Sequence, residues 1–353
     1  KKDLGLLFPG LLRFSELSQF PGEPEWDQRL QMQKESNQHH MAVLGFRCED
    51  QKDNREQRKT DLHPQSEYFD FVSFCPEQAI GLPTPRKPIR LINNADGPDV
   101  RAVEVRDYSL EYTQQLDDYA RSVTPEMSGF SGYIVKKDSP SCGMERVKVY
   151  GKENSPPDKR GVGIFTARLM AQRPDLPVEE EGRLTDPRLR ENFVTRVFTM
   201  FRWQSLLSEG LTRAGLIEFH TRHKFLLLAH DETAYRELGR LLSDLSVKAA
   251  AADLDSFAAE YLRLLMVGLR RLSRPGKHAN VLMHVMGYVK NHLTSDEKAE
   301  MLEHIEAHRK NLVPVIVPIT LLNHFLRKYP NDYIAGQYYL EPHPRELMLR
   351  NGI

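Results

Sequence analysis

Sequence patterns typical of strands occur in the first 180 or so residues of this 353-residue chain and almost disappear after them. This difference divides the expected fold into two parts. Up to about residue 180, "EYFDFVSFCPE" (67–77) and "GYIVKKDSPSCG" (132–143) favour strands that run into loops, and "GVGIFTARLMAQ" (161–172) favours a helix. From Asp186 and Pro187, suited to an N-cap and a first helical position, apolar residues recur at helical spacing. The pattern predicts an α/β N-terminal domain with an open, mostly parallel, Rossmann-like sheet, followed by an all-α C-terminal domain.

Three parts are expected along the chain. Residues 1–40 form an irregular lead-in interrupted by prolines, residues 41–180 form the α/β domain with a helix at 108–122, and residues 181–353 form the helical domain. The predicted helices of the helical domain cover residues 187–207, 212–230, 231–244, 253–272, 278–293 and 295–311.

Composition excludes several classes of function. The 49 Lys and Arg residues balance 49 Asp and Glu residues, so a nucleic-acid surface would have to be a local patch rather than a bulk positive field. No apolar run approaches the roughly 20 residues of a membrane span, and the N-terminus does not resemble a secretory signal, so we expect a cytoplasmic protein without membrane contact. Three cysteines far apart in sequence favour metal ligands, nucleophiles or core residues over a disulfide framework.

Two of the cysteines are predicted to lie close together. Cys75 ends one predicted strand and Cys142 follows another. In a parallel sheet both loops leave the same edge, where open α/β folds bind ligands. The alternative is two unrelated buried thiols. The polar, proline-containing loops favour a shared and exposed site.

Several long motifs resemble a known family. The segments "FCPEQAIGLPTPR" (74–86) and "KKDSPSCG" (136–143) are similar to signature loops of the bacterial thiouracil desulfidase family. Four further segments resemble the helical domain often fused behind it, in a combination similar to desulfidases that convert 4-thiouridine in tRNA to uridine. These are "RLTDPRLRENF", "FHTRHKFLLLAH", "HANVLMHVMGYVKNHL" and "PHPRELMLRN".

The resemblance implies an iron–sulfur enzyme. Its members hold a [4Fe-4S] cluster with three cysteines and leave one iron open for the substrate's sulfur, an arrangement that suits a soft thiocarbonyl and polarises it for attack by water. By motif, Glu77 matches the catalytic glutamate, and Ser139 and Ser141 match the catalytic serine position. The alternatives are a solvated loop carboxylate and serines that cap a turn.

The first cluster ligand departs from the family pattern. Where the family has Cys-Leu-Leu-Gly, this chain has "MAVLGFRCEDQKDN" (41–54), with Ala42 in the expected cysteine place and Cys48 six residues further on. Either Cys48 joins Cys75 and Cys142 as the third metal ligand through a shifted loop, or the site is incomplete.

Basic residues flank both cysteine loops. They are expected to hold phosphates without reading bases and to favour the thiolate form of cysteine; the alternative is an ordinary charged surface. The set comprises Arg86, Lys87, Lys136, Lys137, Arg146 and Lys148.

The helical domain carries a second candidate group. His220, His223 and Lys224 share one predicted helix face, which is typical of hydrogen-bonded structure or RNA contacts more often than of metal binding. The basic loop at 270–278, "RRLSRPGKH", is expected to contact phosphate. The helical domain as a whole is predicted to bind the body of tRNA. An apolar stripe favours core packing over base stacking: Phe193, Val197, Phe201 and Leu207.

Three functions follow from these features. The first is removal of sulfur from 4-thiouridine in tRNA by a non-redox, [4Fe-4S]-dependent desulfidase. The second is the same chemistry on free thiouracil or another thiolated base. The third, motivated by Ala42, is a non-catalytic RNA-binding protein with a degraded cluster site.

Overall fold

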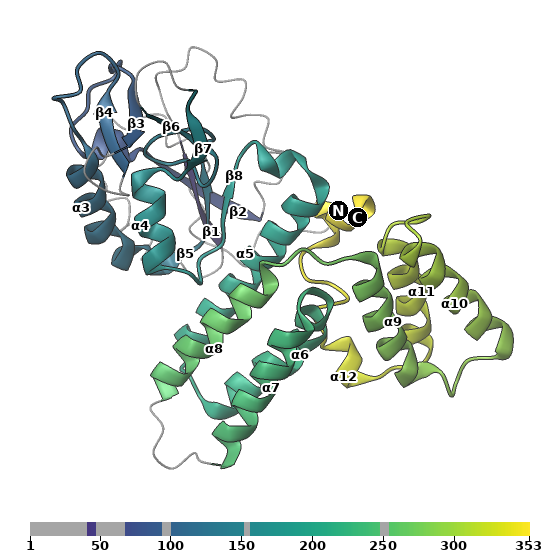
Figure 1. Cartoon of the computed structure of the whole chain (residues 1–353). Helices are drawn as coiled ribbons and strands as arrows, with labels where there is room; N and C mark the ends of the chain where they lie inside the picture. The colour runs from purple at the N-terminus through teal and green to yellow at the C-terminus, as the bar shows by residue number, and fades with distance from the viewer. Residues whose placement is uncertain (1–40, 47–67, 94–99, 152–155, 248–253) are drawn as a thin grey trace, which may run out of the picture. The chain divides into compact units, whose positions relative to one another are not determined.

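A computed structural model describes residues 41–46, 68–93, 100–151, 156–247 and 254–353 of the chain (Figure 1). The predicted irregular lead-in and the candidate ligand Cys48 lie outside these residues. The described part has strands and helices up to residue 180 and helices beyond it, which confirms an α/β part with a parallel sheet followed by a helical part.

The first sheet is fully parallel and carries the predicted strands. Its order is β2-β1-β5-β8, and each neighbouring pair is parallel. Apolar residues dominate β5, which is buried along its whole length, as expected of an interior parallel strand. The strands are β1 (Met41–Phe46), β2 (Phe69–Phe74), β5 (Phe130–Val135) and β8 (Val178–Glu180).

A second sheet departs from the expected single parallel sheet. Its order is β4-β3-β6-β7; β3 and β6 run parallel, whereas β3–β4 and β6–β7 are antiparallel. Short connections join both antiparallel pairs, and only antiparallel strands can be joined in that way. The strands are β3 (Ile89–Asn93), β4 (Val100–Glu104), β6 (Val147–Tyr150) and β7 (Asp158–Gly161).

The helices of the α/β part are shorter than predicted. The helix expected at 108–122 begins at Thr113, because Glu111 forms an isolated bridge with Val103 of β4 instead of starting a turn. The α/β part contains α2 (Pro76–Ala79), α3 (Thr113–Val123) and α4 (Ile164–Gln172), with 3-10 turns at Thr124–Gly129 and Arg183–Thr185.

The helical part begins where the sequence indicates. The Asp186 side chain accepts hydrogen bonds from the backbone N–H groups of Arg188 and Leu189, so it caps α5. Two helices beyond the predicted set, α11 and α12, complete the described fold. The helices are α5 (Pro187–Ser208), α6 (Arg213–His230), α7 (Glu232–Val247), α8 (Leu254–Leu269), α9 (Pro275–Val289), α10 (Ser295–Arg309), α11 (Ile316–Lys328) and α12 (Asp332–Ala335), followed by 3-10 turns at Arg345–Leu347 and Leu349–Gly352.

Helix α5 packs against the first sheet through the predicted apolar stripe. Phe193 and Val197 are buried and Phe201 is partly buried against the same cluster. An added Cβ at Gly132 of β5 would lie 2.7 Å from Val197, so this glycine permits the close approach. Leu207, in contrast, is 46% exposed and does not belong to the core as expected, because it lies in the last turn of α5.

The remaining helices enclose a separate apolar core. Buried residues from α6, α8 and α9 contribute most of it, with Tyr261 and Leu282 fully buried. Among the described residues, no helix has both the length and the apolar character needed to cross a membrane.

Candidate functional site

Cys75 and Cys142 leave the first sheet at the same edge. Cys75 follows β2 and begins α2, and Cys142 lies in the loop between β5 and β6. Both strands are parallel to β1, so their carboxyl ends point the same way. The thiols are buried, with Cys75 5% and Cys142 0% exposed, which corrects the expectation of an exposed thiol.

The three candidate catalytic residues form one hydrogen-bond chain. The Ser141 hydroxyl donates to Glu77 Oε1 at 2.5 Å, and the Ser139 and Ser141 hydroxyl oxygens lie 3.0 Å apart. Ser139 Oγ also accepts from the backbone N–H of Cys142 at 3.1 Å. A turn-capping serine, a buried serine and the carboxylate are thereby joined beside the thiols.

Arg86 belongs to this site rather than to a surface that contacts phosphates. Its side chain is only 7% exposed, and its Nε lies 2.7 Å from Glu77 Oε2. Its Nη2 donates to Cys75 Sγ at 3.3 Å. The sequence shows that Arg86 is charged and lies eleven residues after Cys75, which indicates that it is near the thiol. The sequence does not show that the Arg86 side chain is buried.

Tyr133 is a residue of the site that the sequence analysis did not find. Its ring is fully buried in β5. Burial raises the pKa of its phenol well above the ordinary value, and the neighbouring Cys142 and Cys75 act in the same direction. Tyr133 therefore forms part of the wall around the two thiols.

Burial decides the protonation of the thiols in the metal-free chain. It raises the pKa of Cys75 above the ordinary value despite the opposing charge of Arg86. It raises the pKa of Cys142 well above that value, and the charges of Glu77 and Cys75 add to the effect, whereas a hydrogen bond from Ser141 opposes it. The charge of Arg86 favours the thiolate of Cys75 as expected of the basic set, but burial outweighs this effect at both cysteines.

Alkylation of the metal-free protein tests this balance. A raised pKa leaves less thiolate at a given pH, so Cys75 and Cys142 should react with iodoacetamide more slowly than glutathione at pH ~8, and faster as the pH rises. Cys142 should be the slower of the two. Site-resolved mass spectrometry gives both rates, with urea-unfolded protein as the control; rapid modification of Cys142 at neutral pH would contradict the expectation.

Gly163 allows the Cys142 loop to approach α4. A Cβ at Gly163 would lie 2.5 Å from both the Cys142 backbone N and the Ser141 carbonyl carbon. Thr166 Oγ1 of the same helix donates to the Cys142 carbonyl at 2.7 Å. The start of α4 therefore fixes the position of the loop that carries Ser141 and Cys142.

Gly163→Ala is expected to displace this loop. The clash is with backbone, which cannot rotate away, so unfolding should become easier by about 1–3 kcal/mol. Gly239→Ala is the matched control, since nothing lies within 4 Å of a Cβ there and a mid-helix alanine is favoured. Thermal unfolding followed by circular dichroism measures both, and equal midpoints for the two variants would show that the loop tolerates the change.

The other basic residues lie at the surface. Lys137, Arg146 and Lys148 are exposed. Lys136 pairs with Glu181 at 3.2 Å, and Lys87 pairs with Glu104 at 3.0 Å. Their contact with nucleic acid stays a prediction.

The histidines of α6 pack into the helical core. His223 is buried, its Nδ1–H donates to the Phe219 carbonyl at 2.7 Å, and its ring stacks on that of Phe219. His220 Nδ1 lies 3.1 Å from the Tyr261 hydroxyl, and Lys224 lies over the Tyr333 ring. Burial makes a direct RNA contact by His223 unattainable in this arrangement, and the structural alternative describes all three residues.

The loop at 270–278 is partly engaged in ion pairs. Arg271 Nε lies 3.0 Å from Asp231 Oδ2, and Lys277 Nζ lies 3.5 Å from Glu232 Oε2. Residues 270–274 connect α8 and α9, and the remaining residues begin α9.

The pairing of β1 with β2 shows where position 42, the expected place of the first cluster ligand, lies along the sheet. Ala42 pairs with Asp70 near the start of β2, whereas Phe46 pairs with Phe74, the residue before Cys75. At about 3.3 Å per residue, Ala42 lies more than 10 Å along the sheet from the edge that carries the thiols. Cys48 follows Phe46 by two positions in the sequence and itself lies outside the described residues.

Within the described residues, no group of three His, Cys, Asp or Glu side chains could hold a metal ion. The two buried thiols nevertheless fit iron–sulfur chemistry, because thiolates are the usual ligands of such clusters. A cluster at these two thiols would need a third donor besides them.

Both halves of the chain are similar to known protein families. Residues 45–181 match the family model 2-thiouracil desulfurase, and residues 224–344 match the model of a protein of unknown function, DUF1722. The Escherichia coli (strain K12) protein named "Uncharacterized protein YbgA" is 32% identical over 165 residues, which cover 47% of this chain and 96% of the relative. The chain therefore belongs to the YbgA family, and its residues 45–181 are similar to the 2-thiouracil desulfurase family.

A solved structure of the [4Fe-4S]-dependent thiouracil desulfidase TudS also shows similarity. It is 24% identical and covers 42% of this chain and 94% of that chain, with a TM-score of 0.29. A TM-score this low does not establish a common fold.

Proposed function

We propose that this chain removes sulfur from a thiolated pyrimidine, and specifically that it converts 4-thiouridine in tRNA to uridine. The observation that carries the proposal is the meeting of Cys75, Cys142, Glu77 and Ser141 at one sheet edge. The 2-thiouracil desulfurase match over residues 45–181 supports the same chemistry.

The proposed cofactor is a [4Fe-4S] cluster. Cys75 and Cys142 would hold it together with a third thiolate, for which Cys48 is the candidate. When bound, the cluster supplies an iron atom that binds the thiocarbonyl sulfur as a Lewis acid. Cluster binding requires both thiols to lose their protons, so the raised pKa values predict weaker cluster retention as the pH falls.

Glu77 is proposed as the general base. Its two carboxylate oxygens accept hydrogen bonds from Ser141 and Arg86, and a carboxylate has roughly four acceptor positions, so capacity remains for a water molecule. Glu77 would take a proton from that water as its oxygen attacks the ring carbon. Ser141, held by Ser139, can supply a proton to the ring nitrogen.

The reaction balances without an electron donor. The carbon–sulfur double bond is replaced by a carbon–oxygen double bond, water supplies the oxygen and two protons, and sulfur leaves as hydrogen sulfide. No atom changes its oxidation state, in keeping with a non-redox desulfidase.

tRNA is proposed as the substrate because positive charge is exposed beside the site. Lys137, Arg146 and Lys148 could hold phosphates. A base must leave its stack to reach a buried thiol, which costs a few kcal/mol, and backbone contacts elsewhere on the chain would offset that cost. Free thiouracil is the second candidate, favoured by the description of the matched family.

The test combines cofactor and activity measurements. Anaerobically reconstituted protein should bind four irons per chain, as the [4Fe-4S] formula requires, and should remove the near-ultraviolet 4-thiouridine band from bulk tRNA. Turnover of tRNA, 4-thiouridine nucleoside and 2-thiouracil is then compared, with Cys142→Ala as the cofactor-deficient control. Faster turnover of the free base would favour the second candidate, and no cluster with an unchanged band would favour a non-catalytic RNA-binding protein.

A further inference from the structure

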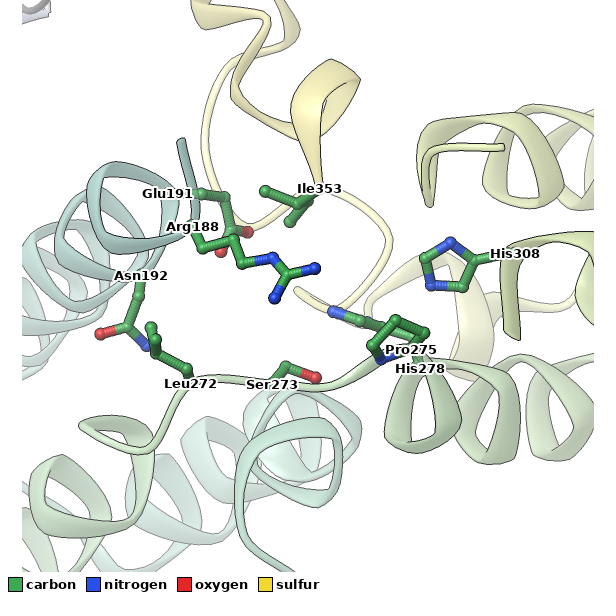
Figure 2. Close-up of a pocket in the computed structure, with 9 residues that line it drawn as sticks. All are labelled: Arg188, Glu191, Asn192, Leu272, Ser273, Pro275, His278, His308 and Ile353. Carbon is green, nitrogen blue, oxygen red and sulfur yellow. The ribbon is translucent and has the colours of Figure 1, made fainter. Parts of the chain in front are cut away.

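A small pocket lies in the helical part, where the beginnings of α5 and α9 meet α10 (Figure 2). It is formed by residues that the proposed desulfidase chemistry does not use. Its free volume is about 20 Å³, which is enough for one water-sized group and too small for a nucleobase. The lining residues on which the argument depends are Arg188, Glu191, Ser273, Pro275, His278 and His308.

The mouth of the pocket favours an anion. Arg188 is exposed, and Figure 2 shows its guanidinium extending across the opening toward His278. Helix α9 begins there with Pro275 at its first position, and no side-chain hydrogen bond caps it. The N-terminus of a 15-residue helix carries a partial positive charge. Pro275 has no N–H, and the N–H groups of Lys277 and His278 donate to the Arg274 carbonyl, which leaves the N–H of Gly276 for a phosphate oxygen.

The interior of the pocket offers an acceptor. His308 is 2% exposed, and its Nδ1–H donates to the Val313 carbonyl at 3.1 Å. Its Nε2 is buried without a hydrogen-bond partner among the described residues. Burial lowers the pKa of His308, so the ring is neutral and Nε2 carries a lone pair. In Figure 2 the ring points from α10 toward the pocket.

The carboxylate of Glu191 does not neutralise the positive charge at the opening of the pocket. Burial alone would raise its pKa, but the neighbouring His343 and the charge of Arg350 hold that pKa well below the ordinary value. Arg350 Nε lies 3.3 Å from Glu191 Oε1, so a buried cation compensates the carboxylate. The charge of Arg188 at the opening is left available to a ligand.

A buried acceptor behind a cationic mouth suits a ligand that carries a small hydrogen-bond donor, such as a hydroxyl, next to an anion. A phosphate diester alone has no hydroxyl for Nε2, and a metal ion would find no group of three suitable donors among the described residues. RNA carries a 2′-hydroxyl beside each backbone phosphate. A hydroxyl is small enough for the interior, whereas a whole nucleobase is not.

We propose that this pocket binds one ribose-phosphate unit of an RNA strand. The 2′-hydroxyl donates to His308 Nε2, and the adjacent phosphate contacts Arg188 and the beginning of α9. The inference rests on the proposed function insofar as RNA is the partner, and it adds that the helical part distinguishes RNA from DNA at this position.

The phosphate contact is tested with the full chain and unmodified tRNA. Arg188→Gln should weaken binding about tenfold, the value of one charge-assisted hydrogen bond, and should lower the slope of log affinity against log salt by about one. The matched control is Arg327→Gln, an exposed arginine of α11 outside the pocket. An equal loss in both variants would mean general electrostatics and overturn the proposal.

The hydroxyl contact is tested with His308 variants. Asparagine places an amide N–H near the position of Nδ1 and removes Nε2, whereas glutamine places a polar atom near Nε2. His308→Asn should reduce the preference for an RNA strand over the DNA strand of the same sequence about tenfold, and His308→Gln should retain most of it. An unchanged RNA-to-DNA ratio in a folded His308→Asn variant would overturn the proposal.

The outcomes separate this inference from the proposed function. If the wild-type chain turns over 4-thiouridine in tRNA but Arg188→Gln and His308→Asn bind as it does, only the pocket proposal fails. If the wild-type chain binds no RNA, both fail. Inorganic phosphate at matched ionic strength is the last arm: displacement of RNA by millimolar phosphate would identify free phosphate as the ligand.

Discussion

Glu77→Gln is expected to lower desulfidase turnover by roughly 10²–10⁴-fold, the usual contribution of a general base. The amide keeps the size of the side chain and can still accept from Ser141 or Arg86, but it cannot take a proton from water. Loss of 4-thiouridine absorbance under single-turnover conditions measures the effect. Ser141→Ala should lose less, because Glu77 would keep its contact with Arg86 at 2.7 Å.

A second variant separates chemistry from folding. Glu77→Gln leaves the Arg86 guanidinium 7% exposed and without its carboxylate, which should lower the free energy of unfolding by about 1–3 kcal/mol. The double variant Glu77→Gln with Arg86→Met removes the uncompensated charge, so stability should recover while turnover stays low. Recovery of both would show that Glu77 has only a structural role.

Glu104→Gln is the matched control for this prediction. Glu104 is also buried and pairs with Lys87, yet it lies in β4 away from the thiols. It should retain turnover within a few-fold of wild type. An equal loss of turnover in Glu104→Gln would indicate that removal of any buried carboxylate from the α/β part is harmful.

The fold was predictable where local signals and tertiary packing agree. Asp186 and Pro187 mark a helix start in sequence and in structure, and the loops of Cys75 and Cys142 meet because parallel strands share an edge. The second sheet was not predictable, since the antiparallel pairing of β3 with β4 depends on partners rather than on propensity. Helix α11 was missed because Pro318 lies within its first turn, where proline is tolerated but reads as a break.

The site was predictable by residue type but not by burial. Glu77, Ser139 and Ser141 lie together as the motif indicates. The sequence shows the charge of Arg86 and the polarity of His223, whereas only packing shows that each is buried against a specific partner. The sequence also could not place Ala42, because register decides which end of a strand a residue occupies.

The register of β1 leads to a prediction about which cysteine supplies the third ligand of the proposed cluster. Phe46 pairs with Phe74, the residue before Cys75, and Ala42 lies four residues earlier in β1. Cys48 is the cysteine that follows. We expect Cys48→Ser and Cys142→Ser each to lose nearly all bound iron after anaerobic reconstitution, because two thiolates cannot hold the cluster stably.

Restoring a cysteine at position 42 tests the register directly. Ala42→Cys in the Cys48→Ser background should not recover iron, because a side chain near the start of β1 is more than 10 Å along the sheet from Cys75. Iron, sulfide and the visible absorbance of the cluster are measured for both variants and for wild type. Recovery by Ala42→Cys would identify position 42 as the lost ligand, and retention of iron by Cys48→Ser alone would exclude Cys48. Failure of recovery, with full iron in wild type and loss of iron in Cys48→Ser, would support Cys48 rather than position 42 as the source of the third thiolate.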